Sequence, residues 1–250
     1  MQKGTAIQWT DETWNVAKGC TKVDEDCKYC YMYRDSMEGT RYDPKDIVKT
    51  KTVFNKPLKI LNPSKIFTSS LTDVFHPAID PYRNEVWDII RKCPQHTFQI
   101  LTKRPERIIE CLPDDWGFGW ANVWLGTSIG SEAGFYKRFP EIVKVPALPL
   151  FISFQPRYEP IDYNVDISDA VKIDWAIIGG ESGNENGKYK YRPCKLEWIE
   201  SLASEAQGYG TAVFIKQMGT YLAKELKMSD RHGGNIDEFP KHLQIRNFPK

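Results

Sequence analysis

The sequence lacks the features that mark membrane and secreted proteins. No stretch approaches the roughly 18 uninterrupted apolar residues that a membrane span needs. Residues 1–9 do not combine a basic segment with a following apolar run, so no secretory signal is indicated. The net charge is only +1, which excludes a strong overall attraction to nucleic acid or to an anionic membrane. We therefore expect a soluble intracellular protein without membrane contact, whose partners bind through local patches.

Cysteine is scarce, and its distribution is uneven. The 250 residues include 6 cysteines, and three of them, Cys20, Cys27 and Cys30, follow the spacing C-x6-C-x2-C. Disulfides are disfavoured in a reducing cell, so a cluster of this kind indicates metal binding or redox chemistry. The other three are isolated and are expected to be small buried apolar residues: Cys93, Cys111 and Cys194.

A linker rich in serine, glycine and proline is also absent, which favours a single domain over residues 1–250. Short β-rich apolar runs recur, nearly continuous in hydrophobicity, as in strands buried on both faces. Helix-like stretches at 83–92, 106–112 and 196–206 lie between several of them. This alternation predicts an α/β fold, a parallel (β/α) partial or full TIM-like barrel of about six to eight strands. The expected strands are 64–69, 97–102, 123–127, 149–154, 175–179 and 212–216, with a first element within 7–15.

Two segments fall outside this alternation. Residues 31–63 form a long, charged connection that we interpret as an insertion or a lid. Residues 228–250 have no clear periodicity and are interpreted as a C-terminal extension.

Polar residues follow every predicted strand at the point where it ends. Active sites of parallel barrels collect at the carboxyl ends of the strands, so these residues are expected to surround one pocket. Such side chains can also be helix caps or solvated groups, and it is their repetition at equivalent places that favours a site. The candidates are Ser69, Ser70, Asp73, His76, Lys103, Thr127, Ser128, Gln155, Arg157, Glu181, Lys216 and Gln217.

Two kinds of metal centre suit the three cysteines. A zinc ion usually takes a fourth Cys or His ligand, and the nearest histidine is His76, after the next predicted strand. Three thiolates can instead hold an iron–sulfur cluster and leave one iron for a ligand other than protein. Tyr29, the aromatic residue directly before Cys30, favours the iron–sulfur cluster.

The segment Cys-Lys-Tyr-Cys at 27–30 resembles the C-x-aromatic-C end of the radical S-adenosylmethionine (SAM) signature, in which the aromatic ring lies near the adenine of the cofactor. More closely, the chain is similar to the phage-associated three-cysteine-motif family of uncharacterised proteins, from residue 13 to about residue 240. The matching elements are TWN at 13–15, GC at 19–20, CKYCY at 27–31, TDVFH at 72–76, GGESG at 179–183, KQMG at 216–219, HGG at 232–234 and FP at 239–240.

The resemblance implies a radical SAM enzyme in the cytoplasm of a bacterial or phage-infected host cell. Cys20, Cys27 and Cys30 would hold a [4Fe–4S] cluster as the catalytic metal ligands, and SAM would bind its open iron. With an electron from a reductant such as flavodoxin or ferredoxin, SAM would be cleaved to a 5′-deoxyadenosyl radical that abstracts hydrogen from the substrate. The SAM-binding residues implied by position are Tyr29 for adenine, Ser69, Ser70 and Asp73 for the methionine amino group, Lys103 and Arg157 for the carboxylate, and Thr127 and Ser128 for the ribose.

Two features depart from the superfamily pattern. The usual first gap is C-x3-C, and here a charged loop, residues 21–26, lengthens it to C-x6-C. The superfamily's Gly-Gly-Glu usually follows the second strand, whereas here Gly179, Gly180 and Glu181 follow the sixth predicted strand. Glu181 is therefore a predicted pocket residue without an assigned role.

The substrate is predicted from a run of basic and aromatic residues, KYKYR, at 188–192. Proteins that bind single strands or flipped bases stack rings on bases and place cations on phosphates, so nucleic acid or a nucleotide is favoured. Two alternatives stay open: the same chemistry on a peptide or small metabolite, and a non-enzymatic zinc-knuckle module that binds nucleic acid. The residues predicted for the substrate pocket are His76, Gln155, Glu181, Lys216, Gln217, Tyr189, Tyr191 and Arg192.

Overall fold

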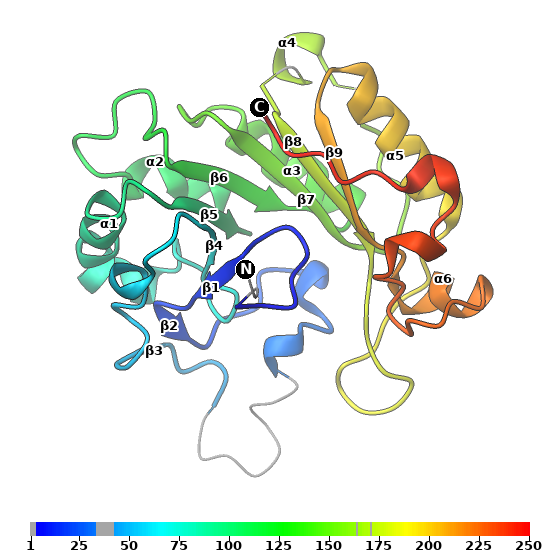
Figure 1. Ribbon diagram of the computed structural model, residues 1–250, viewed down its shortest axis with the longest axis horizontal. Coiled ribbons are helices and arrows are strands. Elements are labelled where there is room, and N and C mark those ends of the chain that lie inside the picture. Colours follow the sequence, from blue (N-terminus) through cyan, green and yellow to red (C-terminus); the bar gives the residue numbers. More distant parts are fainter. Residues whose placement is uncertain (1–3, 34–42, 164, 171) are drawn as a thin grey trace.

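The structure is a computed structural model that describes residues 4–33, 43–163, 165–170 and 172–250. In these residues one sheet of seven parallel strands curls into a half-barrel with β1 and β9 at its open edges (Figure 1). The predicted α/β class and partial barrel are confirmed, and each predicted strand overlaps an observed one. Across the sheet the strands are β1 (Glu12–Trp14), β4 (Lys65–Thr68), β5 (Thr97–Thr102), β6 (Val123–Ser128), β7 (Leu150–Arg157), β8 (Trp175–Gly180) and β9 (Ala212–Gln217).

Helices pack against the convex face of the sheet (Figure 1). The three predicted helical stretches are confirmed, although the second is a 3-10 turn followed by one short helix. No helix in the described ranges is long and apolar enough to cross a membrane. The α-helices are α1 (Arg83–Arg91), α2 (Ile108–Cys111), α3 (Glu132–Ile142), α4 (Ile167–Ala170), α5 (Leu196–Gly208) and α6 (Gly219–Glu225). The 3-10 turns are η1 (Glu25–Cys27), η2 (Tyr31–Tyr33), η3 (Pro57–Lys59), η4 (Pro77–Tyr82), η5 (Pro105–Arg107), η6 (Ile236–Glu238) and η7 (Lys241–Leu243).

Alternate residues of each strand pack in different hydrophobic cores, because successive side chains of a strand point to opposite faces. In β8, Ala176 and Ile178 pack in the outer core beneath the helices, whereas Trp175 and Ile177 pack inside the half-barrel. Burial of both faces explains why the strands are continuous apolar runs in the sequence. The inner core consists of Trp9, Phe67, Phe151, Trp175, Ile177 and Phe214.

The C-terminal segment pairs with the edge strand β9. The amide of Asn247 donates to the Val213 carbonyl at 2.9 Å, and the amide of Ile215 donates to the Ile245 carbonyl at 2.8 Å. This pairing covers an edge that would otherwise present unpaired backbone groups. Part of the segment predicted as a C-terminal extension therefore completes the sheet.

The segment predicted as an insertion or a lid, 31–63, includes residues 34–42, which lie outside the described residues. Its described part contains β3 (Val48–Lys49), which pairs antiparallel with β2 (Ala17–Lys18). It also contains Phe54, whose carbonyl accepts a hydrogen bond from the Trp14 indole at 2.8 Å. Closure of this segment over a substrate stays a prediction.

Trp175 lies at the centre of the inner core, and its replacement tests how much that core contributes to stability. Its ring centroid is within 6.0 Å of those of Trp9 and Phe214, and its side chain has no exposed surface. We expect Trp175→Ala to lower the free energy of unfolding by about 3–5 kcal/mol, measured by urea denaturation. The control is Phe118→Ala at a position 94% exposed, with an expected change within about 0.5 kcal/mol. Equal losses in both variants would contradict the role of the inner core.

Candidate active site

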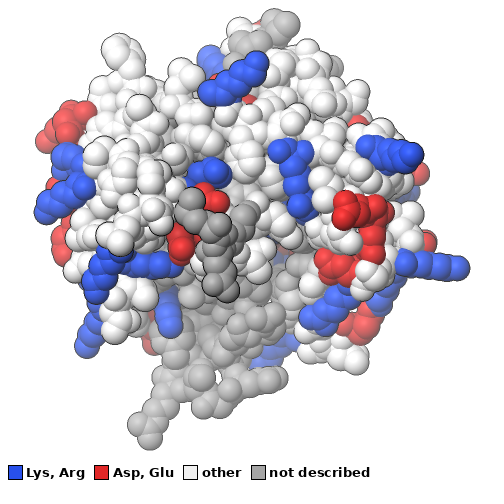
Figure 2. Space-filling view, viewed as in Figure 1, with Lys and Arg blue, Asp and Glu red and all other residues white. Residues whose placement is uncertain are grey.

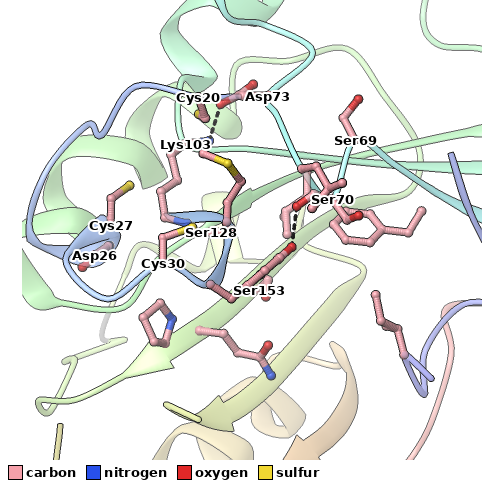
Figure 3. A pocket seen from close by; sticks show the side chains of 18 of the residues that line it. Cys20, Asp26, Cys27, Cys30, Ser69, Ser70, Asp73, Lys103, Ser128 and Ser153 are labelled. Atoms are coloured by element: carbon pink, nitrogen blue, oxygen red, sulfur yellow. Dashed lines mark hydrogen bonds between the residues drawn. The ribbon is translucent and has the colours of Figure 1, made fainter. Parts of the chain in front are cut away.

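A cavity of about 730 Å³ lies at the carboxyl ends of the strands (Figure 3). Trp9, Phe67 and Leu101 form an apolar part of its wall, which continues the inner core. Tyr189, in the loop after β8, lines the cavity as predicted. Residues at the ends of β4 to β9 line the rest, so the structure brings many of the predicted polar strand ends to one pocket. They are Ser69, Ser70, Thr72, Asp73, Thr102, Lys103, Ser128, Ser153, Gln155, Glu181, Lys216 and Gln217.

The three clustered cysteines all line this pocket and are partly exposed to it. They belong to the loop 19–33 between β2 and β3, and Figure 3 shows them on one side of the pocket, with Ser69 and Ser70 opposite. Among the described residues, no three Cys, His, Asp or Glu side chains are grouped so that they could hold a metal ion. Sulfur ligands of one tetrahedral zinc ion lie only about 4 Å apart, so binding a single ion would require these thiols to turn.

Charged neighbours act on two of the thiols. Burial, reinforced by the carboxylate of Asp73, raises the pKa of Cys20 to about 11, although the Arg104 guanidinium, 3.9 Å from its sulfur, acts in the opposite direction. Burial also raises the pKa of Cys30, and the positive charge of Lys103 opposes this rise. Without a bound metal, both thiols are therefore protonated at neutral pH.

A buried ion pair anchors the lengthened gap between the first two cysteines. Asp26 accepts a hydrogen bond from Arg138 of α3 at 2.7 Å, and neither side chain is exposed. Asp26 also accepts from the Tyr158 hydroxyl at 2.6 Å, while Asp24 forms a second ion pair with Arg138. Burial opposes ionisation of Asp26, but the hydrogen bonds from Tyr158 and Arg138 outweigh it and lower its pKa. This anchor was not predicted from the sequence, although the acidic residues of the loop were a signal for it.

A second ion pair connects the cysteine loop to β4 and β5. Asp73 accepts hydrogen bonds from the Thr102 hydroxyl at 2.8 Å and from Arg104 at 3.0 Å. Arg104 also donates to the Thr21 carbonyl at 3.0 Å, one residue after Cys20. Asp73 therefore lines the pocket as predicted, but its carboxylate is already engaged in positioning the loop.

The predicted Gly-Gly-Glu segment makes a third connection. The Arg192 guanidinium donates two hydrogen bonds to Glu181, of 2.9 and 2.7 Å, and lies 3.4 Å from the ring centroid of Tyr158. It also donates to the carbonyl of Glu25 at 3.0 Å. Arg192 does not line the pocket, contrary to prediction, because these contacts hold it between two loops. A Cβ on Gly179 would lie 2.5 Å from the Gln155 amide nitrogen, so glycine here permits close packing of β8 against β7.

Four other predicted pocket residues lie outside the cavity. Thr127 points to the convex face, as alternation along β6 requires, and donates to the Thr102 carbonyl at 2.9 Å. Arg157 follows a register shift in β7 that carries it away from the pocket, and burial lowers its pKa to about 10. Tyr191 donates to Glu185 at 2.5 Å on the surface.

The fourth, His76, caps the turn η4, and its Nδ1 accepts from the Ala78 amide at 3.1 Å. Its other ring nitrogen lies 2.9 Å from the Thr21 hydroxyl. Burial, together with the charge of Arg104, lowers the pKa of His76. Both nitrogens are engaged, which leaves neither available as the fourth ligand of the alternative zinc site.

Several polar atoms in the pocket wall remain available to a ligand. The Ser69 hydroxyl, the Thr72 hydroxyl and the Gln155 amide nitrogen are buried without a hydrogen-bond partner among the described residues. Lys216 donates to Gln155 at 3.1 Å, and burial lowers its pKa to about 8. Buried polar groups usually find partners, so these atoms fit a ligand with its own hydrogen-bonding groups.

A second, smaller cavity of about 330 Å³ adjoins the first and shares Tyr29 and Cys30 with it. Four lysines line it, and we call it the lysine groove. Elsewhere basic and acidic side chains are interspersed on the surface, as Figure 2 shows for one face. The residues of the lysine groove are Lys22, Lys28, Tyr29, Cys30, Tyr33, Gly187, Lys188 and Lys190.

Disruption of the Asp26–Arg138 pair tests the anchor of the cysteine loop. Arg138→Met leaves a buried carboxylate unpaired and should lower the free energy of unfolding by about 3–5 kcal/mol in urea denaturation. The double variant Asp26→Asn/Arg138→Met should lose less than the sum of the two single variants, because either substitution alone breaks the pair. For the exposed pair Lys144–Glu141, Lys144→Met should cost less than about 1 kcal/mol. Additive losses at Asp26 and Arg138 would contradict the anchor.

The low pKa of Lys216 predicts a pH-dependent effect on stability. Between about pH 8 and roughly pH 10.4, the ordinary pKa of an unfolded lysine, the unfolded chain holds a proton that the folded chain has lost. Stability therefore rises with pH over this range, and the charged lysine destabilises the fold most below pH 8. Lys216→Met should therefore be more stable than the wild type at pH 6, with a difference that shrinks toward pH 10. Urea denaturation of both proteins at pH 6, 8 and 10 measures this, and a pH-independent difference would rule it out.

Comparison with known proteins gives one match. Residues 4–242 match the model of a family described as "Protein of unknown function (DUF5131)". No curated protein and no solved structure matches the chain significantly. Because the match spans nearly the whole sequence, the chain belongs to the DUF5131 family.

Proposed function

We propose that this protein is a radical SAM enzyme that modifies or repairs nucleic acid or a nucleotide. The observation that carries the proposal is that Cys20, Cys27 and Cys30 line one pocket at the carboxyl ends of the strands of a parallel half-barrel. That is where parallel α/β enzymes concentrate their catalytic groups. The curled sheet and the cysteine motif are independent features, and both agree with the radical SAM type of fold that the sequence resembles.

The donor set fits a [4Fe–4S] cluster better than a zinc ion. Among the described residues, only three cysteines line the pocket. Three thiolates would hold three irons of a cluster and leave the fourth iron open for SAM. His76, the candidate for a fourth zinc ligand, has both ring nitrogens engaged. When bound, the cluster would supply the electron that cleaves SAM to methionine and a 5′-deoxyadenosyl radical, which takes hydrogen from the substrate.

The chain's own residues would bind and orient SAM. The Ser69 and Thr72 hydroxyls lack partners among the described residues and suit the methionine end. Lys103, whose charge opposes the raised pKa of Cys30, would balance negative charge on the thiolates or on the SAM carboxylate. Tyr29 adjoins the cysteines and suits the adenine, and Ser128, which lines the pocket, suits the ribose.

Partners beyond SAM follow from the same chemistry. The reaction requires an electron donor such as flavodoxin or ferredoxin, and cytoplasmic location would provide one. A nucleic acid or nucleotide is favoured over a peptide or a small metabolite because the lysine groove opens beside the cysteines. The chain is nearly neutral overall, but binding of phosphates needs only a local patch of basic residues, and the lysine groove is such a patch.

Replacement of one cysteine tests the metal centre. In Cys27→Ala, iron and sulfide content after anaerobic reconstitution should fall to background, and reductive SAM cleavage should disappear with it. The matched control is Cys93→Ala, which removes a buried cysteine outside the pocket and should retain both. Iron and sulfide are measured chemically, and 5′-deoxyadenosine is measured by chromatography.

Two results would contradict the proposal. Retained SAM cleavage in Cys27→Ala would show that the thiol is not needed for the reaction. A colourless wild-type protein with one zinc and no cleavage would favour the zinc-knuckle module instead.

A further inference from the structure

The lysine groove lies between two loops that are distant in the sequence. Lys22 and Lys28 come from the cysteine loop, and Lys188 and Lys190 come from the loop after β8. All four lysines are exposed, and no acidic side chain lines the groove among the described residues. Four positive charges around about 330 Å³ make a local positive potential in a chain whose net charge is only +1.

The two lysines of the cysteine loop are neutralised only weakly by the protein itself. Lys28 pairs with Glu25 at 3.1 Å, but both side chains are about half exposed or more, at 48% and 70%, so water screens the pair. Lys22 donates to the backbone carbonyl of residue 28 at 2.8 Å, and a carbonyl does not cancel its charge. An anionic ligand could therefore form ion pairs with these lysines without first breaking a strong ion pair within the protein.

Two half-buried tyrosines lie between the lysines. The Tyr33 hydroxyl donates to the Cys20 carbonyl, which fixes the position of the ring, and the Lys22 ammonium lies 5.0 Å from its centroid. Tyr29 has Lys28 at 5.9 Å and Arg192 at 5.5 Å from its ring centroid. Rings interleaved with cations are what proteins use for unpaired nucleotides, because bases stack on rings while cations meet phosphates. An acidic peptide would pair with the lysines only and would leave the tyrosine rings without a ligand to stack on.

The two cavities meet at one of the clustered cysteines, Cys30. Tyr29 and Cys30 line both of them, so a chain of phosphates in the lysine groove would have a nucleotide beside the opening of the larger pocket. A base inside a duplex could not enter that pocket without leaving the stack, whereas a base of a single strand could.

We propose that the lysine groove binds the sugar–phosphate backbone of single-stranded nucleic acid and directs one nucleotide into the cysteine-lined pocket. Lys188 and Lys190 hold phosphates from one side of the groove, and Lys22 and Lys28 hold them from the other. Binding of the strand depends on the groove alone. The role of the strand as substrate rests on the proposed function.

The test compares two double variants that change net charge equally. Lys188→Ala/Lys190→Ala removes one side of the groove, and the control Lys92→Ala/Lys137→Ala removes two exposed lysines that do not line it. Binding of a fluorescein-labelled single-stranded oligonucleotide of mixed sequence, as DNA and as RNA, is measured by anisotropy over a series of salt concentrations that begins at low salt. Polyglutamate serves as a competitor, and iron is determined in the same reconstituted preparations.

At low salt the groove variant should bind at least about tenfold more weakly than wild type, with the control within about twofold. The slope of log K against log salt should fall in magnitude by about 1.4, or about 0.7 for each phosphate that the variant no longer neutralises. Absence of wild-type binding, equal weakening in the two variants, or displacement by polyglutamate as effective as by unlabelled oligonucleotide would each overturn the inference. Iron content separates the two proposals, since binding without iron retains the groove and rejects only the radical chemistry.

Discussion

The position of the three cysteines depends on one buried ion pair, Asp26 with Arg138. The two residues are 112 positions apart in the sequence, and neither side chain is exposed. Burial of two charges is costly, and it is tolerated here because Asp26 accepts further hydrogen bonds from Tyr158 and from the amide of Gly130. Without Arg138, the buried carboxylate of Asp26 would have no opposite charge beside it and Asp24 would lose its ion pair, which would favour movement of the cysteine loop toward water.

Two more ion pairs complete the attachment of the loop to the half-barrel. Asp73 and Arg104 connect it to β4 and β5, and Glu181 and Arg192 connect it to the end of β8. The loop is therefore held at three places, by α3, by the ends of β4 and β5 and by the end of β8, which is how a site keeps its groups within the small tolerances that chemistry needs. The extra length of the first cysteine gap belongs to this attachment: residues 24 and 26 in the gap are the ones that pair with Arg138.

The sequence predicted the sheet well because its strands are buried on both faces. Trp175 to Ile178 alternate between the inner and outer cores, and each face demands apolar side chains, so the strand is visible as one run. The position of the pocket could be predicted because the carboxyl ends of parallel strands meet at one edge of the sheet. Thr127 could have been assigned to the convex face by counting along β6, because residues two apart share a face.

Other parts of the site could not be predicted from local pattern. A register shift in β7 redirects Arg157; Pro156 in the strand indicates an irregularity there but not where the next side chain points. Arg192 belonged to a run of basic residues typical of nucleic-acid binding, yet it pairs with Glu181, which only the folded chain brings near. His76 became a helix cap instead of a metal ligand because the turn that follows it needs an acceptor for the amide of Ala78. A register shift, an ion pair and a turn cap decide these roles, and the spacing of residues in the sequence reveals none of them.

The proposed radical chemistry requires that the three cysteines hold a cluster with one iron open to SAM. The most direct measurement is electron paramagnetic resonance of the anaerobically reconstituted, dithionite-reduced protein, recorded with and without SAM. We expect a signal of a reduced [4Fe–4S] cluster whose g values change when SAM is added, because SAM would bind to the open iron. A cluster signal that SAM leaves unchanged, or a protein that holds zinc and gives no signal, would contradict it.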